Sequence, residues 1–223
     1  MVRYARRGAS VVAFLVVALM FSWLFVPASA TNVTASSLLT KVSVKAESGG
    51  STYQRSYFKH WTDADSDCQH TRTEVLVSES TVTPAYSSNR CTVTRGRWSS
   101  YYDGATWTNP ADVDIDHVVA LKEAWESGAS GWATGTRTAY ANDLSFWPSL
   151  VAVTDNVNQS KSDRDPAEWL PPRSAARCTY AIQWVQVKYR WRLTIDAAER
   201  STLSSLLSGS CGARSVVLPP RAR

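Results

Sequence analysis

The first thirty residues constrain this chain most, because they determine the compartment in which the remainder folds. Three arginines among the first seven residues precede residues 11–26, all but one of which are apolar, and small residues follow. A positive start, an apolar middle and alanines at positions −3 and −1 predict a signal peptide cleaved after Ala30. An uncleaved membrane anchor is disfavoured, since the apolar segment is shorter than the ~20 residues that span a bilayer.

Export places the four cysteines in an oxidising compartment, where an even number usually forms disulfides. No cysteine belongs to a CxxC pair and the three histidines are scattered, so the spacing does not indicate a zinc site. Nearness in the sequence predicts that Cys68 pairs with Cys91. Cys178 and Cys211 stand at the outer ends of two predicted C-terminal helices, and they are therefore expected to pair with each other.

Chain length and net charge limit the number of domains and the kinds of binding partner to be expected. The 223 residues, 44% of them hydrophobic, are enough for one sizeable core, so we expect a single domain. Removal of residues 1–30 takes away three arginines and no acidic residue, so the formal net charge falls from +5 to +2. This mildly basic charge permits binding to a polyanion but does not indicate it.

The mature chain divides into three parts. We expect an N-terminal arm at residues 31–52, a disulfide-stapled α+β domain at residues 53–212 and a disordered tail at residues 213–223. Extended patterns predict strands at 73–77 and 91–94. Apolar residues at helical spacing after Cys178 predict a C-terminal helical hairpin, with Thr194 as the cap of its second helix.

An acidic triplet precedes the first cysteine. Asp63, Asp65 and Asp67 resemble the start of a calcium loop, but the glycine and the distal glutamate of an EF-hand are missing. The triplet therefore favours a solvated turn over a calcium site.

Two later segments carry chemistry. Residues 113–119 form an extended Val-Asp-Ile-Asp-His-Val-Val segment, in which apolar residues surround Asp116 and His117. Residues 150–154 form a second predicted strand, and the polar residues 156–163 begin a helix. An aspartate and a histidine at a strand end are more often structural than catalytic, but the strand, strand, helix order favours a site.

Asp-Ile-Asp-His-Val-Val and Asn-Gln-Ser-Lys-Ser-Asp resemble the two halves of an HNH nuclease motif. The pattern is similar to the HNH domain of RNA-guided CRISPR effectors, and closer to a family of exported bacterial HNH-like proteins related to the C-terminal domain of the GmrSD restriction enzyme. Residues 68–76, 128–132 and 165–172 also resemble that family. The likeness spans about residues 55–211 and implies a central ββα-metal motif.

The resemblance implies roles for three side chains. His117 matches the general base, Asp116 the metal-binding carboxylate beside it, and Asn158 the ligand at the start of the helix. Phosphodiester hydrolysis needs a water that is deprotonated in line with the leaving oxygen, and a divalent ion that offsets the developing charge. A histidine pKa near 6.5 suits the first task, with activity that rises as the histidine loses its proton. Oxygen ligands suit Mg²⁺, with Mn²⁺ as the alternative.

One part of the motif departs from the pattern. The middle asparagine of HNH motifs, which pins the loop between the strands, would fall near Ser149. Asn142 is the alternative candidate for this role. The remaining possibility is that no residue holds the loop in this way.

Two basic residues follow the predicted ligand on its helix. Lys161 and Arg164 are each expected either to contact a substrate phosphate or to form an ion pair with Asp163 or Asp165. The sequence assigns no role to His60, His70, Arg72 and Glu74.

The leading interpretation is a secreted, metal-dependent endonuclease that hydrolyses DNA, with RNA as a further substrate, at low sequence specificity. The resemblance implies 5′-phosphate and 3′-hydroxyl ends, and we expect a monomer with no membrane association after signal cleavage. The alternative is a non-catalytic secreted module that binds polysaccharide or cell envelope through its tryptophans, most of which we expect in the core. A hydrolase of another bond, such as a peptidase, is disfavoured because neither GxSxG nor HExxH occurs.

Overall fold

The computed structural model describes residues 31–222, and the expected signal peptide lies outside these residues. Helices alternate with short antiparallel strand pairs, so the domain is mixed, as expected. Cys68 is bonded to Cys91 and Cys178 to Cys211, which confirms both predicted pairs. Within residues 31–222, every helix is too short or too polar to cross a membrane.

The described strands form antiparallel pairs, each a separate two-stranded sheet. The pairs are β1 (Asn32–Thr34) with β8 (Ser215–Val217), β2 (Ala85–Tyr86) with β3 (Val93–Arg95), β4 (Trp98–Ser99) with β5 (Thr106–Trp107), and β6 (Val113–His117) with β7 (Leu150–Thr154). The α-helices are α1 (Ala35–Leu39), α2 (Thr71–Glu79), α3 (Leu121–Glu126), α4 (Thr134–Ala141), α5 (Asp155–Lys161), α6 (Arg177–Arg190), α7 (Ala197–Leu206) and α8 (Gly209–Gly212). Single 3₁₀ turns occur at Gly50–Thr52, Arg55–Tyr57, Pro110–Asp112, Ala129–Gly131, Trp147–Ser149 and Ser174–Ala176.

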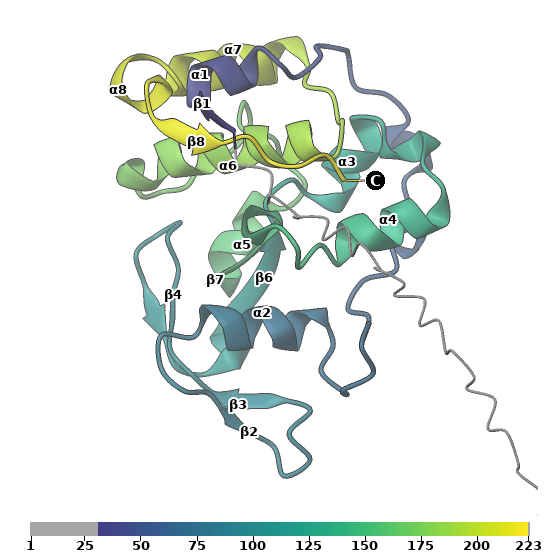
Figure 1. The fold of residues 1–223 in the computed structure, drawn as a ribbon, viewed down its shortest axis with the longest axis vertical. Coiled ribbons are helices and arrows are strands. Elements are labelled where there is room, and N and C mark those ends of the chain that lie inside the picture. The colour runs from purple at the N-terminus through teal and green to yellow at the C-terminus, as the bar shows by residue number, and fades with distance from the viewer. Residues whose placement is uncertain (1–30, 223) are drawn as a thin grey trace, which may run out of the picture.

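The ribbon of β6 and β7 lies between a larger helical half of the molecule and a smaller half that contains α2 and β2 to β5 (Figure 1). Side chains alternate between the two faces of each strand. Val113 and Ile115 of β6 pack into the small core beside α2, whereas Val151 and Val153 of β7 pack into the large core beside α6. The ribbon therefore belongs to both cores, and its position is determined from both sides.

Helix α5 follows β7 directly and covers the polar face of β6. Asp114 and Asp116 are two residues apart on the strand and so share a face, while Asn158 and Lys161 are three residues apart on the helix. Asn158 contacts Asp114 and Lys161 contacts Asp116. The predicted strand, strand, helix order is present, and it pairs the polar side chains of α5 with those of β6.

Residues 71–79 form α2 rather than the strand predicted at 73–77. The β-branched Thr73, Val75 and Val77 led to the strand prediction. The His70 side chain accepts a hydrogen bond from the Thr73 amide and caps the helix, and Val75 and Leu76 are buried against the ribbon. Capping and tertiary packing therefore outweigh the intrinsic strand preference.

Both ends of the described part of the chain, residues 31–222, are ordered, in contrast to the disordered tail predicted at residues 213–223. The strand β8 pairs with β1 of the predicted N-terminal arm, and α1 of that arm buries Leu38 and Leu39 in the large core. Beyond β8, Arg190 donates a hydrogen bond to the Pro220 carbonyl at 2.8 Å and accepts one from the Ala222 amide at 3.0 Å. These contacts hold the tail on α6.

Helices α6 and α7 follow each other, but the cap of α7 is Asp196 and not Thr194. The Asp196 side chain accepts from the Glu199 amide at 2.7 Å, and the Glu199 side chain accepts from the Asp196 amide at 3.2 Å. This reciprocal capping box satisfies two amides at the helix start. Thr194 instead donates to the carbonyl of Ser127 at the end of α3.

Candidate active site

A pocket of about 350 Å³ opens where the end of β6, the start of α3 and the C-terminal half of α5 meet. The predicted base His117 and both predicted ligands, Asp116 and Asn158, line this pocket together. The other lining residues are Tyr53, Arg55, Ile115, Ala120, Leu121, Lys122, Gln159, Ser162 and Asp163. The fold thus brings together side chains that are far apart in the sequence.

His117 is held on three sides. Its Nε2 lies 2.9 Å from the carbonyl oxygen of Ala141, at the end of α4. The indole of Trp61 stacks on the imidazole, with ring centroids 5.5 Å apart and planes 18° apart. Tyr140 is also nearly parallel, at 6.3 Å and 20°. The imidazole therefore has a single orientation in the pocket wall.

The Ala141 contact selects the tautomer of His117. A carbonyl oxygen only accepts hydrogen bonds, so Nε2 carries the proton and the neutral ring presents Nδ1 as an acceptor. Burial lowers the pKa of His117 from 6.5 to about 3, against the hydrogen bond to Ala141, which favours the charged form. The ring is therefore neutral above about pH 4, in contrast to the ordinary pKa expected from the sequence.

Asp116 is buried and bonded through both oxygens. Oδ1 accepts from Nζ of Lys161 at 2.9 Å, and Oδ2 accepts from the Tyr102 hydroxyl at 2.6 Å. Burial raises the pKa of Asp116, and the Lys161 charge and these hydrogen bonds oppose that rise. A carboxylate has about four lone-pair directions, so two remain beyond these contacts.

The two basic residues expected at the substrate lie elsewhere. Lys161 is fully buried, and its Nζ also donates to the His117 carbonyl at 3.1 Å, so it faces the interior and not a phosphate. Its ion pair is with Asp116 rather than with Asp163 or Asp165. Arg164 donates to the carbonyls of Ser160 and Lys161 at the end of α5, and it does not line the pocket.

Asn158, the second candidate metal ligand, is oriented by Asp114. Nδ2 of Asn158 donates to Oδ2 of Asp114 at 3.2 Å, which leaves the Asn158 amide oxygen as an acceptor. This oxygen and the remaining lone pairs of Asp116 are hard ligands of the kind that Mg²⁺ prefers, and Mg²⁺ retains several waters in sites with few protein ligands. The side chains present at the pocket therefore fit a hard divalent ion.

Two cations at the pocket have no counterpart in the sequence analysis. Arg55 is exposed on the Arg55–Tyr57 turn, and no carboxylate within residues 31–222 lies within ion-pair distance of it. Lys122, at the start of α3, lies 3.6 Å from Asp163 and 3.9 Å from Glu126. No local pattern marks either residue, because each reaches the pocket only through the tertiary fold.

The two residues considered for the middle asparagine make different contacts. Ser149 donates to Oδ2 of Asp143 at 2.9 Å, within the loop between β6 and β7. Asn142, in the same loop, donates to the Lys59 carbonyl at 2.8 Å and accepts from the Thr62 amide at 3.0 Å. Asn142 therefore connects this loop to the segment that carries Trp61.

The four residues without a predicted role lie outside the pocket. Arg72 donates to the carbonyls of Pro110 and Val113 at the start of β6, at 2.9 and 2.8 Å. His60 lies 2.8 Å through Nδ1 from the Phe58 carbonyl, His70 caps α2, and Glu74 is half-buried on α2.

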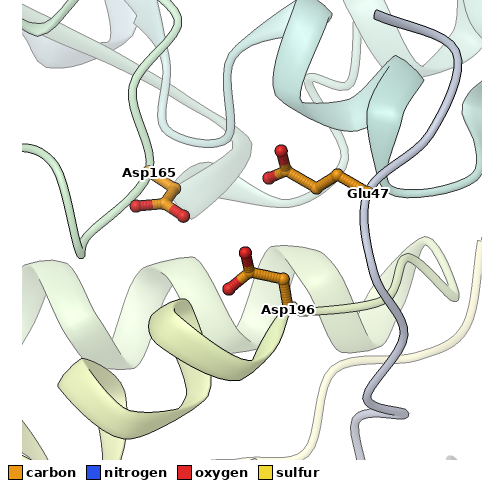
Figure 2. Close-up of side chains that lie close together, drawn as sticks. All are labelled: Glu47, Asp165 and Asp196. Carbon is orange, nitrogen blue, oxygen red and sulfur yellow. The ribbon is translucent and has the colours of Figure 1, made fainter.

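Acidic side chains form separate groups away from His117. Asp63, Asp65 and Asp67 are exposed, and oxygens of Glu47, Asp165 and Asp196 converge from three different segments (Figure 2). Burial and the neighbouring carboxylates raise the pKa of Glu47 to about 8. Acidic groups of this kind are common without an ion, so neither group by itself defines a metal site.

The tryptophans mainly serve the core, as expected. Trp98 and Trp184 are fully buried, and within residues 31–222 Trp147 is the single tryptophan that is largely exposed, at 57%. A row of indole platforms for bases or sugars is therefore absent from the described part of the chain.

Comparison with known proteins gives one family and one relative. The family described as "GmrSD restriction endonucleases, C-terminal domain" matches residues 70–205, more than half of the chain. An "uncharacterized secreted protein" of the fungus Arthroderma benhamiae is 46% identical over 175 residues, which cover 78% of this chain and 84% of the relative. This fungal relative gives no support to the expectation of a bacterial family. No solved structure matches the chain significantly.

Proposed function

The chain belongs to the family of the GmrSD restriction endonuclease C-terminal domain, and from this premise we propose that it is a metal-dependent endonuclease that hydrolyses phosphodiester bonds. DNA is the proposed main substrate and RNA a further one, with low sequence specificity. The observation that carries the proposal is the pocket at the end of β6, which is lined by a neutral histidine and by two side chains with oxygen atoms.

In the proposed reaction, Nδ1 of His117 accepts a proton from a water molecule in the pocket. The water oxygen forms a bond to phosphorus, the bond from phosphorus to the leaving oxygen breaks, and the leaving oxygen takes a proton from solvent. The hydrogen bond from Nε2 to Ala141 keeps Nδ1 unprotonated and ready to accept. The pKa of about 3 makes His117 a weak base in the free protein. The water molecule therefore transfers its proton to Nδ1 at the same time as its oxygen forms the bond to phosphorus.

A divalent ion, when bound, offsets the negative charge that develops on the phosphate and the leaving oxygen. We propose Asp116 and Asn158 as its protein ligands, with Mg²⁺ as the ion and Mn²⁺ as the alternative. Lys161 and Tyr102 hold the Asp116 carboxylate in place, and Asp114 orients the Asn158 amide.

Arg55 and Lys122 replace Lys161 and Arg164 as the proposed phosphate contacts. Both line the pocket, Arg55 from the turn Arg55–Tyr57 and Lys122 from α3. An arginine without a carboxylate partner can donate two parallel hydrogen bonds to a phosphate.

We also propose that the protein is secreted and acts outside the cell. The signal peptide predicted from the sequence, the two disulfides and the description of the fungal relative as secreted support this location. A monomeric state stays a prediction. No observation favours the alternative of a polysaccharide-binding module, because most of the described tryptophans are at least half-buried.

Cleavage assays test the proposal. Purified mature protein is incubated with plasmid, linear DNA and RNA, in Mg²⁺, Mn²⁺, Ca²⁺, Zn²⁺ or chelator. Cleavage in Mg²⁺ or Mn²⁺ that stops in chelator is expected. Full activity after complete removal of metal, or no cleavage of any substrate with any ion, would contradict it.

A further inference from the structure

The C-terminal end of α4 reaches His117 by two routes. The carbonyl of Ala141, the last residue of α4, accepts the hydrogen bond from Nε2 of the imidazole. The next residue, Asn142, holds the segment at residues 59–62 with its side chain, and Trp61 of that segment stacks on the same imidazole. One direct contact and one indirect contact therefore start from adjacent residues.

The Asn142 side chain uses its full hydrogen-bonding capacity. Nδ2 donates to the carbonyls of Lys59 and Thr138, both at 2.8 Å. Oδ1 accepts from the Thr62 amide at 3.0 Å and from the Thr71 hydroxyl at 2.7 Å. Only a side chain with two donors and an accepting oxygen satisfies this arrangement. An aspartate in this position would lose both donors and place its charge beside two carbonyl oxygens.

Trp61 is held in an unfavourable backbone conformation. Its φ of 56° lies in the left-handed region, which bulky side chains rarely adopt. The hydrogen bonds of Asn142 to Lys59 and Thr62 flank Trp61 on both sides and maintain this conformation. Strain of this kind persists where the surrounding contacts determine the backbone, and it is typical of functional sites. Here it turns the indole onto the face of His117.

We propose that Trp61 and Asn142 are positioning residues for His117, with Trp61 fixing the plane of the imidazole and Asn142 fixing Trp61. Tyr140 is the parallel neighbour of the imidazole within α4, and Ala141 anchors Nε2. With the plane and one nitrogen fixed, Nδ1 points in one direction. The catalytic part of this inference rests on the proposed function, because it takes His117 as the base.

The test compares Trp61→Ala, Trp61→Phe and Asn142→Asp with two controls that lie outside the pocket, Trp147→Ala and Asn109→Asp. Each protein is examined at pH 7 by ¹⁵N NMR of the imidazole nitrogens, with His117 assigned by its loss in His117→Ala. The kcat and KM for plasmid cleavage in Mg²⁺ are measured separately. Thermal unfolding shows which variants remain folded.

Wild type and both controls are expected to show one His117 tautomer, protonated at Nε2. Trp61→Ala and Asn142→Asp should give broadened or averaged imidazole signals, with kcat about 10–100-fold lower and little change in KM. Trp61→Phe should restore most of both properties, because phenylalanine retains a stacking face. If Asn142→Asp does not fold, the two Trp61 variants decide the outcome.

Wild-type imidazole signals and wild-type kcat in folded Trp61→Ala would overturn the inference. The NMR measurement does not depend on nuclease activity. A wild-type protein that cleaves no nucleic acid, but whose imidazole loses its fixed tautomer in Trp61→Ala, would contradict the proposed function and support the positioning role.

Discussion

The Nζ atom of Lys161 lies 2.9 Å from Oδ1 of Asp116, and their side chains are 0% and 6% exposed. This buried ion pair joins α5 to β6 directly behind the candidate active site. Removing two charges from water is costly, and the attraction between them repays that cost only when both partners are present. The pair therefore makes the geometry of the site and the stability of the fold depend on the same contact.

Replacement of one partner of this pair should destabilise the protein strongly. Lys161→Met leaves a buried carboxylate without its counterion and should lower the free energy of unfolding by about 3–5 kcal/mol. Arg164→Ala, at an exposed residue just beyond the same helix, should change it by less than about 1 kcal/mol. Denaturant unfolding measures both, and the double variant Lys161→Met/Asp116→Asn should recover part of the loss. Equal stability of Lys161→Met and wild type would show that the pair is not formed in solution.

Loss of the proposed base should affect turnover but not metal binding. His117→Ala should lower kcat by about 10²–10⁴-fold, the range for removal of a positioned proton acceptor, with an unchanged Mg²⁺ dependence. His70→Asn, at a histidine that lies outside the pocket and caps α2, is the matched control, since asparagine can keep the helix cap. Cleavage rates across a Mg²⁺ titration provide the measurement, and a His117→Ala protein that cuts DNA at the wild-type rate would rule out the assignment.

The proposed metal ligand that is best tested alone is Asn158, because a change at Asp116 would also break the buried ion pair. Asn158→Ala should shift the Mg²⁺ titration of activity to higher concentration, with partial recovery at high Mg²⁺. Asn156→Ala, exposed at the start of the same helix, should leave the titration unchanged. A lower maximal rate with an unshifted midpoint would assign Asn158 a role other than metal binding.

Arg55 should contribute to substrate binding without contributing to stability. Arg55→Ala should raise KM for DNA and reduce the slope of log affinity against log salt by about one, as expected for the loss of one phosphate contact. Thermal unfolding should not change, because Arg55 is exposed and has no carboxylate partner among residues 31–222. Arg95→Ala, exposed on β3 outside the pocket, is the control. An unchanged salt slope would place Arg55 away from the bound phosphates.

The free energy of unfolding should decrease as pH rises from about 4.5 to 7, because Glu79 loses its proton in this interval. Burial raises the pKa of Glu79 from 4.5 to about 7, against hydrogen bonds from the Ala152 amide and the Trp147 indole. The folded state thus binds this proton more tightly than the unfolded state. The associated stabilisation is complete below the unfolded pKa and is lost as pH rises through the folded pKa, by at most about 3 kcal/mol.

Urea unfolding at pH 4.5 and 8 tests this contribution. Glu79→Gln should lose less stability than wild type over this interval, since the amide does not titrate. Glu168→Gln, an exposed carboxyl group, should behave as wild type. Equal losses in Glu79→Gln and wild type would mean that other groups, such as Glu47 or Glu199, account for the dependence.

The sequence by itself determined the features that consecutive residues encode. The extended apolar patterns of residues 113–119 and 150–154 predicted the ribbon, and the polar residues after Thr154 predicted the helix that covers it. The pairing of the four cysteines was also predictable, because each pair closes a local segment. These patterns are short-range, so they remain readable without knowledge of the fold.

Only the tertiary structure decided which side chains reach the pocket. Arg55 and Trp61 come from a segment without a recognisable pattern, and the tertiary fold places Arg55 at the pocket and Trp61 on the imidazole of His117. Asn142, from a distant part of the chain, holds the segment that carries Trp61. Lys161 was predicted to contact a phosphate or to pair with Asp163 or Asp165, but it is buried and forms an ion pair with Asp116. The physical reason is that a buried charged group is stable only beside an opposite charge, and the packing of the fold determines which opposite charge lies next to it. The spacing of residues along one helix does not show which residue of another element that is.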